Sequence, residues 1–501
     1  MTPTNAESLA RFMPEAILTL GSIAAFLASL GRRDSTGKSA PATWVALLAL
    51  AGAGAAALAG WQADPIMLFS GMIRLDACAG IFKVMFAIAG ILGVLIALRS
   101  REIPSAGWGE FLGLVLAIVL GMFLLSMASN LLMIYLSLEL VSLCSFVLAG
   151  LGTLHERRMA EGALKYVIYG GTASGLMLFG MSWLYGLTGT LDLAGIRSAL
   201  DALPGEGVTR WTLLVALMLT LAGFGYKIAA APFHQWAPDT YEGAPAPFVG
   251  FLSVGPKAAG FAVLLRFVIT GLVDPATLQP VGEALGRIPI IQIVAILSVA
   301  TMTLGNLTAL VQTNVKRMLA YSSIAHAGYM LMGLTAVSRD GIASVVFYLW
   351  IYMFMNVGAF LVVTAVSHAE GSEDISAFRG LGRRAPLLAI IMTVFLFSLT
   401  GLPPLAGFIA KFYLFAAVIR MGTRFYYALA IVGVLNSVVS LYYYAAVVKA
   451  MFVEKGETES PLASPAFMSG LAVALCVPVI LLGVYWAPLR TYVDWVLVGL
   501  L

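Results

Sequence analysis

Long apolar stretches alternate with short polar breaks along the whole chain. Most stretches hold about 20 apolar residues, the length that a helix needs to cross the hydrocarbon core of a bilayer. The pattern therefore predicts an all-α membrane protein with about fourteen transmembrane helices. They are expected at residues 14–30, 41–60, 75–98, 110–128, 130–151, 160–187, 209–236, 244–272, 289–311, 316–337, 341–367, 385–420, 425–452 and 464–486. Residues 61–74 and 188–208 are expected to be loops, with a short surface helix over 191–203.

Spans 7 and 12 of this series are expected to be broken helices. Residues 385–420 would extend roughly 54 Å as one helix, far more than the hydrocarbon core requires. Pro403 and Pro404 interrupt this span, and Pro232 and Pro238 follow Lys227 in span 209–236. Proline removes a backbone donor and kinks a helix. Unwound backbone at membrane depth is tolerated where protein or water satisfies it, so we expect the conduction path at these two helices.

Short sequence matches at a nearly constant offset predict two inverted five-helix repeats. Residues 135–139 resemble 321–325, residues 192–197 resemble 374–379, and residues 221–227 resemble 405–411. Each match alone is weak, but the three keep one order, and the offset spans five predicted helices. An odd number of helices inverts the second copy in the membrane, which is typical of transporters. The predicted units are 1–108 (spans 1–3), 109–272 (first repeat, spans 4–8), 287–453 (second repeat, spans 9–13) and 464–501 (span 14 and tail).

Composition and charge agree with a membrane protein that carries no redox centre of its own. The chain is 60% hydrophobic and 11% charged, which excludes a water-soluble globular protein. Its net charge of +4 gives no indication of nucleic-acid binding. The three cysteines lie apart in apolar stretches, and the four histidines lack metal-ligand spacing, so neither a cofactor nor a metal is expected in this chain. Basic residues are more frequent in one set of alternate loops, which predicts that both termini are periplasmic.

Ionisable residues inside the predicted spans are the most informative feature of the sequence. Each uncompensated charge at the bilayer centre costs about 2.5–3.5 kcal/mol on insertion scales. A buried lysine can release its proton, whereas an arginine cannot. Only one of the 20 arginines lies within a span, so the selection of lysines indicates proton transfer. The residues are Lys83, Lys165, Lys227, Lys257 and Lys411, with Arg266 near a span end, Glu139 as the only acid in mid-span and His326 as the only mid-span histidine.

Structural roles remain open for several of these residues. Lys83 and Lys165 can extend to an interface or pair with a carboxylate, and Glu139 can be half of a static ion pair. His326 can be a satisfied core histidine. The run Tyr442–Tyr444 is expected to be an interface belt or packing, and Asp239 with Glu242 is expected to order the turn over 234–247.

Two segments resemble the hallmark motifs of a known family. Residues 222–247 (AGFGYKIAAAPFHQWAPDTYEGAPAP) and residues 312–329 (QTNVKRMLAYSSIAHAGY) resemble the antiporter-like, proton-translocating membrane subunits of NADH:quinone oxidoreductase, respiratory complex I. Together with the spans, the resemblance covers essentially the whole chain. The short segment after the last span and Lys411 in span 12 separate the chain from the sister subunits L and M. Subunits of multi-protein sodium/proton antiporters share the core motifs and are the alternative.

The resemblance implies a role for each buried group. Glu139 on span 5 would pair with Lys227 on span 7, and the proton would pass through Lys257 and His326 to Lys411, which faces the outer exit. Lys165 on span 6 would lie near the Glu–Lys pair, and Lys83 has no assigned counterpart. The implied neighbours are the antiporter-like subunit M and the small subunit K in a bacterial inner membrane, and the whole complex would carry FMN, iron–sulfur clusters and quinone.

Three hypotheses follow for the function. In the first, redox chemistry in other subunits separates Glu139 from Lys227, and the lone desolvated ammonium gives up its proton to the relay. The second is a cation/proton exchanger that works without NADH chemistry. The third is a structural anchor whose charges pair statically, so that substitutions damage assembly rather than turnover.

Overall fold

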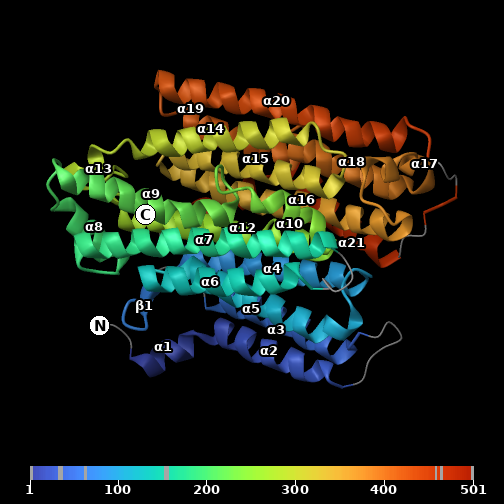
Figure 1. The fold of residues 1–501 in the computed structure, drawn as a ribbon, viewed down its shortest axis with the longest axis horizontal. Coiled ribbons are helices and arrows are strands. Elements are labelled where there is room, and N and C mark those ends of the chain that lie inside the picture. Colours follow the sequence, from blue (N-terminus) through green and yellow to red (C-terminus); the bar gives the residue numbers. More distant parts are fainter. Residues whose placement is uncertain are drawn as a thin grey trace.

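Helices that run side by side along the longest axis make up almost all of the described structure (Figure 1). The structure is a computed structural model, and it describes residues 4–31, 38–60, 65–151, 157–456, 460–462 and 466–497. Apolar stretches of helical length therefore form one layered bundle whose helices share a common direction, as the bilayer requires.

The N-terminal part contributes one side of the bundle (blue in Figure 1). The predicted loop over 61–74 is different in the structure, because its described part contains most of a short antiparallel hairpin. The elements are α1 (Asn5–Arg11), α2 (Met13–Ser29), α3 (Ala40–Ala59), β1 (Ile66–Leu68), β2 (Ile73–Leu75) and α4 (Ala77–Leu98).

The middle of the chain supplies the next helices, and α8 is the surface helix that the sequence predicts. The elements are η1 (Ser105–Gly107), α5 (Trp108–Met127), α6 (Leu131–Ala149), α7 (Arg157–Thr188), α8 (Leu193–Asp201), α9 (Val208–Ile228), α10 (Trp236–Gly243), α11 (Ala246–Leu252) and α12 (Gly255–Gly271).

The last part of the chain completes the bundle, and α16 runs through its centre, where nearly all of its residues are buried. The elements are α13 (Gly282–Gly286), α14 (Ile290–Ala309), α15 (Val315–Thr335), α16 (Arg339–Glu370), η2 (Ile375–Phe378), α17 (Leu381–Arg384), α18 (Pro386–Thr400), α19 (Ala406–Ile419), α20 (Arg424–Phe452), α21 (Ala466–Val484) and α22 (Ala487–Val496). Helices α8 and α13 lie at one end of the bundle, here the α8 end, and α17 lies at the opposite α17 end (Figure 1).

Among the described residues, eleven helices are long and apolar enough to cross a membrane. The sequence predicts more spans because three further predicted spans are not single helices that are long and apolar enough to meet this criterion. Helix α2 is bent by 71° from α1, α15 carries many polar residues, and α18 and α19 are two short helices in place of one long span. The chain is thus a multi-span, mostly helical membrane protein.

Two predicted spans contain a helix break: 385–420 holds both α18 and α19, whereas in 209–236 helix α9 ends early and α10 begins only at the last residue. Helix α9 ends at Ala229 and α18 ends at Gly401, and both residues have the left-handed backbone conformation that commonly terminates a helix. In both places the next backbone N–H turns back, from Ala230 to the Gly225 carbonyl and from Leu402 to the Phe397 carbonyl. A third break, which the sequence analysis did not predict, separates α11 from α12 inside the segment 244–272.

Two isolated β-bridges occupy corresponding places in the two halves of the chain. Asn130 pairs with Asp192 before α8, and Asn314 pairs with Asp374 before η2, at offsets of 184 and 182 residues. The first bridge adjoins α8 and the second leads to α17, so the two bridges lie at opposite ends of the bundle (Figure 1). The helices between the paired residues, α7 and α16, each have 32 residues.

The third sequence match, between residues 221–227 and 405–411, does not agree with the helix breaks. Lys227 lies one residue before the end of α9, whereas Lys411 follows the break, in the second turn of α19. Ala229 and Gly401 hold the equivalent positions, and they are 172 residues apart. The two lysines therefore lie on different sides of their helix breaks, and their pairing as repeat partners stays a prediction.

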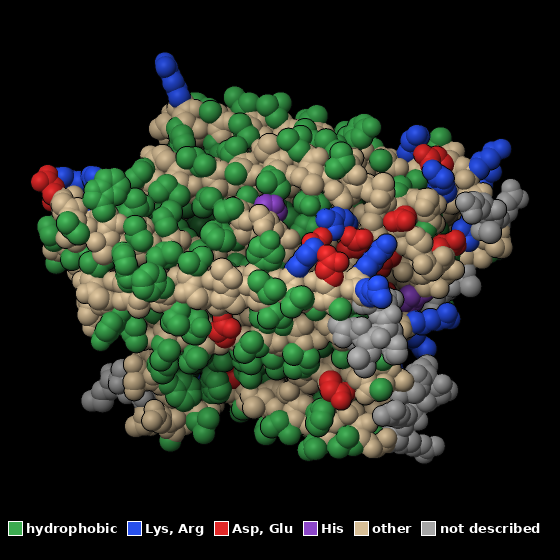
Figure 2. Space-filling view, in the orientation of Figure 1, with side chains coloured by type: hydrophobic (Ala, Val, Ile, Leu, Met, Phe, Trp, Pro, Cys, Tyr) green, Lys and Arg blue, Asp and Glu red, His purple; other side chains and the backbone are tan. Residues whose placement is uncertain are grey.

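The sides of the bundle expose mostly apolar groups. Figure 2 shows hydrophobic side chains over the length of the visible face, and charged side chains gathered in a patch towards the α17 end. Leu143 and Val147 of α6 and Val438 of α20 are more than half exposed. In water such a surface would be unfavourable, whereas acyl chains match it.

Candidate functional site

Four titratable side chains from four different helices are buried in the interior of the bundle. Lys227 of α9, Lys257 of α12, His326 of α15 and Lys411 of α19 each have less than 5% of their surface exposed. These are four of the six residues that the sequence predicts for the site. An unpaired charge in such surroundings is costly, so the partners of each group decide what it can do.

Lys227 and Glu139 lie near each other but are not in contact. The Lys227 ammonium donates a hydrogen bond of 3.1 Å to the Ser142 hydroxyl, and it makes no ion pair within the described structure. Ser142 lies three residues after Glu139 on α6, so the two share one face of that helix. The Oε1 atom of Glu139 is buried and has no hydrogen-bond partner. The carboxylate is therefore free to receive an ammonium that moves towards it.

Helices α9 and α12 are in close contact between the first two lysines. A Cβ atom on Gly260 would lie 2.8 Å from Ile228 and 3.3 Å from the Lys227 Cγ atom. Glycine at this position lets α12 approach the stem of Lys227, one helical turn from Lys257. The two ammonium groups donate to different serines, so no described hydrogen bond links Lys227 with Lys257.

Lys257 is bonded to one serine in two ways. Its ammonium donates to the Ser323 carbonyl at 2.7 Å and to the Ser323 hydroxyl. Tyr352 of α16 donates to the same hydroxyl at 2.9 Å, and its ring lies 5.1 Å from the ring of His326. Ser323 thus connects α12, α15 and α16, and it leads from Lys257 towards His326.

His326 contacts a tyrosine on each side of its ring. Its Nδ1 atom lies 2.5 Å from the Tyr348 hydroxyl, and its Nε2 atom lies 3.4 Å from the Tyr444 hydroxyl. Tyr444 also hydrogen-bonds the Ser322 hydroxyl. Because a hydroxyl can donate and accept at once, these contacts can pass a proton to or from either ring nitrogen.

Lys411 turns back onto the end of the preceding helix. Its ammonium donates to the Thr400 carbonyl at 2.8 Å and to the Ser437 hydroxyl at 3.1 Å, and it lies 4.5 Å from the centre of the Tyr329 ring. A cation at the carboxyl end of a helix is favourable because the last carbonyls lack partners. A cavity of about 300 Å³ beside Lys411 is walled by Phe408 and other residues of α19 and α20.

Asn306 connects the surroundings of Lys411 with the tyrosines of α20. Its side chain donates to the Tyr329 hydroxyl at 3.1 Å and accepts from the Tyr443 hydroxyl at 3.0 Å. The rings of Tyr443 and Tyr444 are 4.4 Å apart. Polar groups therefore follow one another with short gaps from Lys257 to Lys411.

The tyrosines of α20 are the part of the site that the sequence analysis missed. Tyr442 is 70% exposed, but Tyr443 and Tyr444 are buried, so these two pack in the interior instead of forming an interface belt, and their hydroxyls also join the polar network. The available signal was periodicity: Ser437, Ser440 and Tyr444 lie on one face of a helix.

Lys165 occupies a different environment from the other predicted residues. Its ammonium lies 2.6 Å from Glu161 and 2.6 Å from Asp239, and its side chain is 37% exposed. Asp239 and Glu242 also bind Arg317, so this group of charges fastens α7, α10 and α15 together at the surface. It belongs to the charged patch of Figure 2.

Lys83 and a second acid form a buried ion pair that the sequence analysis did not foresee. The Lys83 ammonium lies 2.6 Å from Glu15, and each side chain is 1% exposed. Two acids are more enclosed than Glu139, which is only partly buried: Glu15 is 0% exposed and Asp76 is 2% exposed. Asp76 binds Arg266 through two contacts of 2.8 Å.

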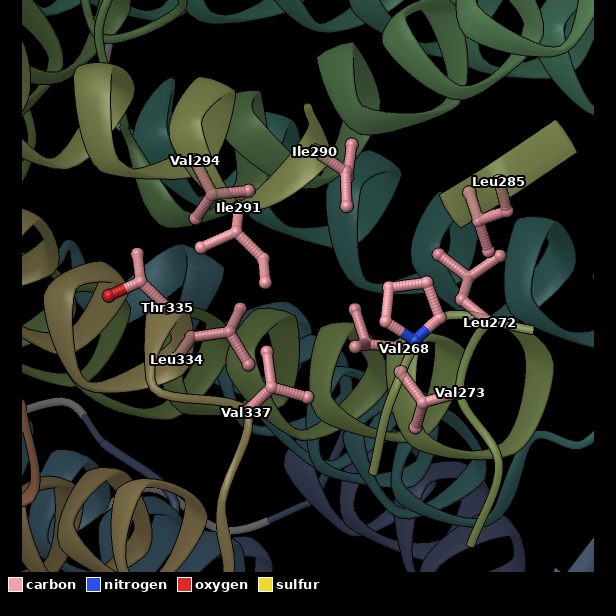
Figure 3. A pocket seen from close by; sticks show the side chains of 11 residues that line it. Val268, Leu272, Val273, Leu285, Ile290, Ile291, Val294, Leu334, Thr335 and Val337 are labelled. Atoms are coloured by element: carbon pink, nitrogen blue, oxygen red, sulfur yellow. The ribbon is translucent and has the colours of Figure 1, made fainter. Parts of the chain in front are cut away.

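An apolar pocket near the α8 end is separate from these groups. Its volume is about 50 Å³, and Figure 3 shows the side chains of Ile291, Leu334 and Val337 gathered around it with Val268. It contains no ionisable side chain, so it contributes nothing to proton transfer.

Comparisons with known proteins agree with both sequence motifs. A family model described as NADH:quinone oxidoreductase/Mrp antiporter, TM, matches residues 128–440. NADH-quinone oxidoreductase subunit N of Anaeromyxobacter sp. (strain Fw109-5) is 49% identical and covers 98% of this chain and 96% of that protein. NADH-quinone oxidoreductase subunit N 2 of Sorangium cellulosum (strain So ce56) is 47% identical, with 98% of each chain covered.

A solved structure with the same fold supports the assignment. A chain of respiratory complex I from Thermus thermophilus with bound Aureothin matches with a TM-score of 0.76 and 33% identity, over 95% of this chain and 98% of that chain. The family model covers more than half of this chain, and the relatives cover nearly all of it. The chain therefore belongs to the family of antiporter-like membrane subunits of NADH:quinone oxidoreductase, respiratory complex I, in which these relatives are subunit N.

Proposed function

We propose that this chain translocates protons in the membrane arm of the complex, through Glu139, Lys227, Lys257, His326 and Lys411. The observation that carries the proposal is the series of buried titratable groups on adjacent helices, linked by hydroxyl groups from Lys257 to Lys411. Redox chemistry in other subunits would supply the energy. The chain itself has no recognisable nucleotide-binding loop, flavin fingerprint or quinone-pocket motif.

The position of Lys227 decides whether it holds its proton. Beside Glu139 the ammonium would be compensated by an opposite charge, and the proton would stay. In the arrangement described here it is bonded to the neutral Ser142 hydroxyl and is buried without a counter-charge, which favours release of the proton. In the proposed cycle, this arrangement would be the separated state of the pair.

From Lys257 onwards the proton would move along fixed groups. Ser323, Tyr352, His326, Tyr444 and Asn306 provide donors and acceptors between Lys257 and Lys411. Water would fill the short gaps, as it does between many buried polar groups. The cavity beside Lys411 is the proposed outlet of this path.

Lys165 would act as a positioning residue. Its bonds to Glu161 and Asp239 hold α7 against α10, the second part of the divided helix that carries Lys227. Movement of α10 relative to α9 would change where Lys227 lies, and Lys165 would influence the relay in this way without carrying the proton.

We also propose fourteen spans that form two inverted repeats over 109–272 and 287–453, preceded by spans 1–3 and followed by span 14. The bridges Asn130–Asp192 and Asn314–Asp374 at opposite ends of the bundle support the repeats. Both termini would be periplasmic in a bacterial inner membrane. The antiporter-like subunit M and the small subunit K are the proposed neighbours, and FMN, iron–sulfur clusters and quinone would belong to the rest of the complex.

The test is substitution of Lys227 or Glu139 by alanine in the assembled complex. Proton uptake driven by NADH is expected to fall at least about tenfold, because a proton-transfer group commonly contributes more than that to a rate. Quinone reduction and copurification of the other subunits report turnover and assembly. Lys449→Ala is the matched control, because Lys449 is 66% exposed on α20.

Each alternative predicts a different outcome. Unaltered pumping by both variants contradicts the relay. Loss of assembly in both variants, without any change in the turnover of complexes that do assemble, supports a static anchor. Sodium-dependent proton movement in vesicles that contain no NADH dehydrogenase supports a cation/proton exchanger.

A further inference from the structure

The N-terminal helices hold a second buried amine–carboxylate pair, apart from the proposed relay. Lys83 of α4 lies 2.6 Å from Glu15 of α2, and both side chains are almost completely enclosed. Neither oxygen of Glu15 has a hydrogen-bond partner in the structure, so the carboxylate depends on one ammonium alone. A carboxylate has about four acceptor positions, and those of Glu15 are mostly unused.

A cavity connects Lys83 of this pair with the surface at the α8 end, and Glu15 lies behind Lys83, outside the cavity wall. Its volume is about 300 Å³, and its walls come from the end of α1, the start of α2, the end of α3 and the start of α4. Arg11, Met13 and Gly60 at its rim are exposed, whereas Gly80 and Lys83 at its floor are buried. A water molecule in the liquid occupies about 30 Å³, so several water molecules fit between the surface and Lys83.

The other charged groups around the cavity are already compensated or lie at its mouth. Asp76 in the cavity wall binds Arg266 of α12 through two contacts of 2.8 Å, and Arg74 lies 3.2 Å from it. Arg11 is at the exposed rim. Helix α3 contributes no ionisable side chain, and α5 presents the ring of Phe123, 5.7 Å from the Lys83 ammonium. Lys83 at the floor and Glu15 behind it are thus the pair whose charge state can change.

The pair is also attached to a helix of the relay. The Asp76 carboxylate accepts a hydrogen bond of 2.8 Å from the Ala79 N–H and so caps α4, the helix of Lys83. Its bond to Arg266 fixes that cap to α12, which carries Lys257. A change in α12 therefore reaches the helix of Lys83 through two strong, charge-assisted hydrogen bonds.

We propose that Glu15 and Lys83 form a second proton-exchange site, open to water at the α8 end and separate from the relay. In the exchange, the Lys83 ammonium passes a proton to the Glu15 carboxylate, which becomes a carboxylic acid, and the Lys83 amine takes a replacement proton from the cavity water. The proton returns to the cavity water when the ion pair forms again. The site involves no relay residue, so it does not depend on the function proposed above.

Water access is tested with cysteine variants in the assembled complex in sealed vesicles. Ala57→Cys places a thiol in the cavity wall, and Ala53→Cys places one a helical turn further along α3, where the residue is fully buried and outside the cavity. A charged, membrane-impermeant methanethiosulfonate is expected to label Ala57→Cys from the α8 side at least about tenfold faster than Ala53→Cys. Equal labelling of the two variants overturns the proposal. Cys78, Cys144 and Cys476 are buried, and the unsubstituted chain gives their background.

Proton exchange is tested by infrared difference spectroscopy. Lys83→Met removes the counter-charge, so Glu15 is expected to become protonated and to show the carbonyl band of a carboxylic acid. The band should shift when the complex is mixed with D₂O and should be absent when Glu15→Gln is added. A band that does not shift in D₂O, or no band at all, overturns the proposal.

A variant that fails to assemble does not prevent the test. In that case the native and Glu15→Gln complexes are compared as the pH is lowered, and the same D₂O-sensitive carbonyl band must appear in the native complex only. Lys227→Ala should leave the labelling and the band unchanged. Failure of the relay and failure of this site are therefore distinguishable.

Discussion

The two divided spans, α9 with α10 and α18 with α19, have the same break but use it differently. In both, a left-handed residue ends the first helix and the following N–H bonds back to the same kind of carbonyl. Lys227 precedes its break, whereas Lys411 follows its break. In Figure 1, α9 and α19 nevertheless both lie towards the α8 end, and α10 and α18 lie towards the α17 end.

The surroundings of the two lysines differ more than their positions. Lys411 is held by the Thr400 carbonyl, the Ser437 hydroxyl and the Tyr329 ring, and it occupies the open end of α18. Lys227 has the Ser142 hydroxyl, with the unpartnered oxygen of Glu139 on the same helix face. The Lys411 ammonium is therefore held in place after its helix break, whereas the Lys227 ammonium is able to move.

The largest effect on proton uptake is expected when the Lys411 ammonium is replaced by a group that cannot release its proton. Lys411→Arg keeps the charge beside Thr400, and the cavity of about 300 Å³ provides room for the larger head group. Because arginine retains its proton, uptake of protons driven by NADH should fall at least about tenfold while the complex still assembles. Lys449→Arg, at an exposed position on the neighbouring helix, is the control. Normal translocation by Lys411→Arg would show that only a charge is needed there.

A smaller effect on proton uptake is expected when the Lys227 ammonium loses its bond to the neutral Ser142 hydroxyl. Ser142→Ala removes a hydrogen bond with a net contribution of about 1 kcal/mol, so Lys227 should move to Glu139 and proton uptake should slow by about fivefold. Ser145→Ala is the matched control, because Ser145 is another buried serine of α6 and its hydroxyl donates to the Val141 carbonyl. Equal slowing by the two variants, measured as initial rates of proton uptake, would contradict the difference between the regions.

The smallest effect is expected from a single hydroxyl in the fixed part of the path. Tyr444→Phe removes the group that contacts both His326 and Ser322, and a neutral hydrogen bond with a net contribution of about 0.5 kcal/mol corresponds to roughly a twofold slower proton uptake. Tyr442→Phe changes the same atoms at a position that is 70% exposed and should leave the rate unchanged. If the two neighbouring variants behave alike, the buried hydroxyls are not part of the path.

The sequence predicted the helices far better than the contacts between them. Almost every span begins and ends within a few residues of its prediction, as in 41–60 for Ala40–Ala59 and 425–452 for Arg424–Phe452. The break between α11 and α12 was missed, because the two residues between these helices, Ser253 and Val254, are not prolines and do not indicate a break. The match of Lys227 with Lys411 did not indicate that the two lysines lie on different sides of their helix breaks.

The chain's own composition determined that it spans a membrane many times and that lysines rather than arginines occupy its interior. These features depend on neighbouring residues, since the length of an apolar stretch and the cost of a charge within it are local quantities. Only the tertiary structure decided which charges meet. Glu15 pairs with Lys83, Asp76 pairs with Arg266 across 190 positions of the chain, and His326 meets Tyr444 across 118. The packing of helices that are distant in the sequence sets these partners, and no local pattern records which helices become neighbours.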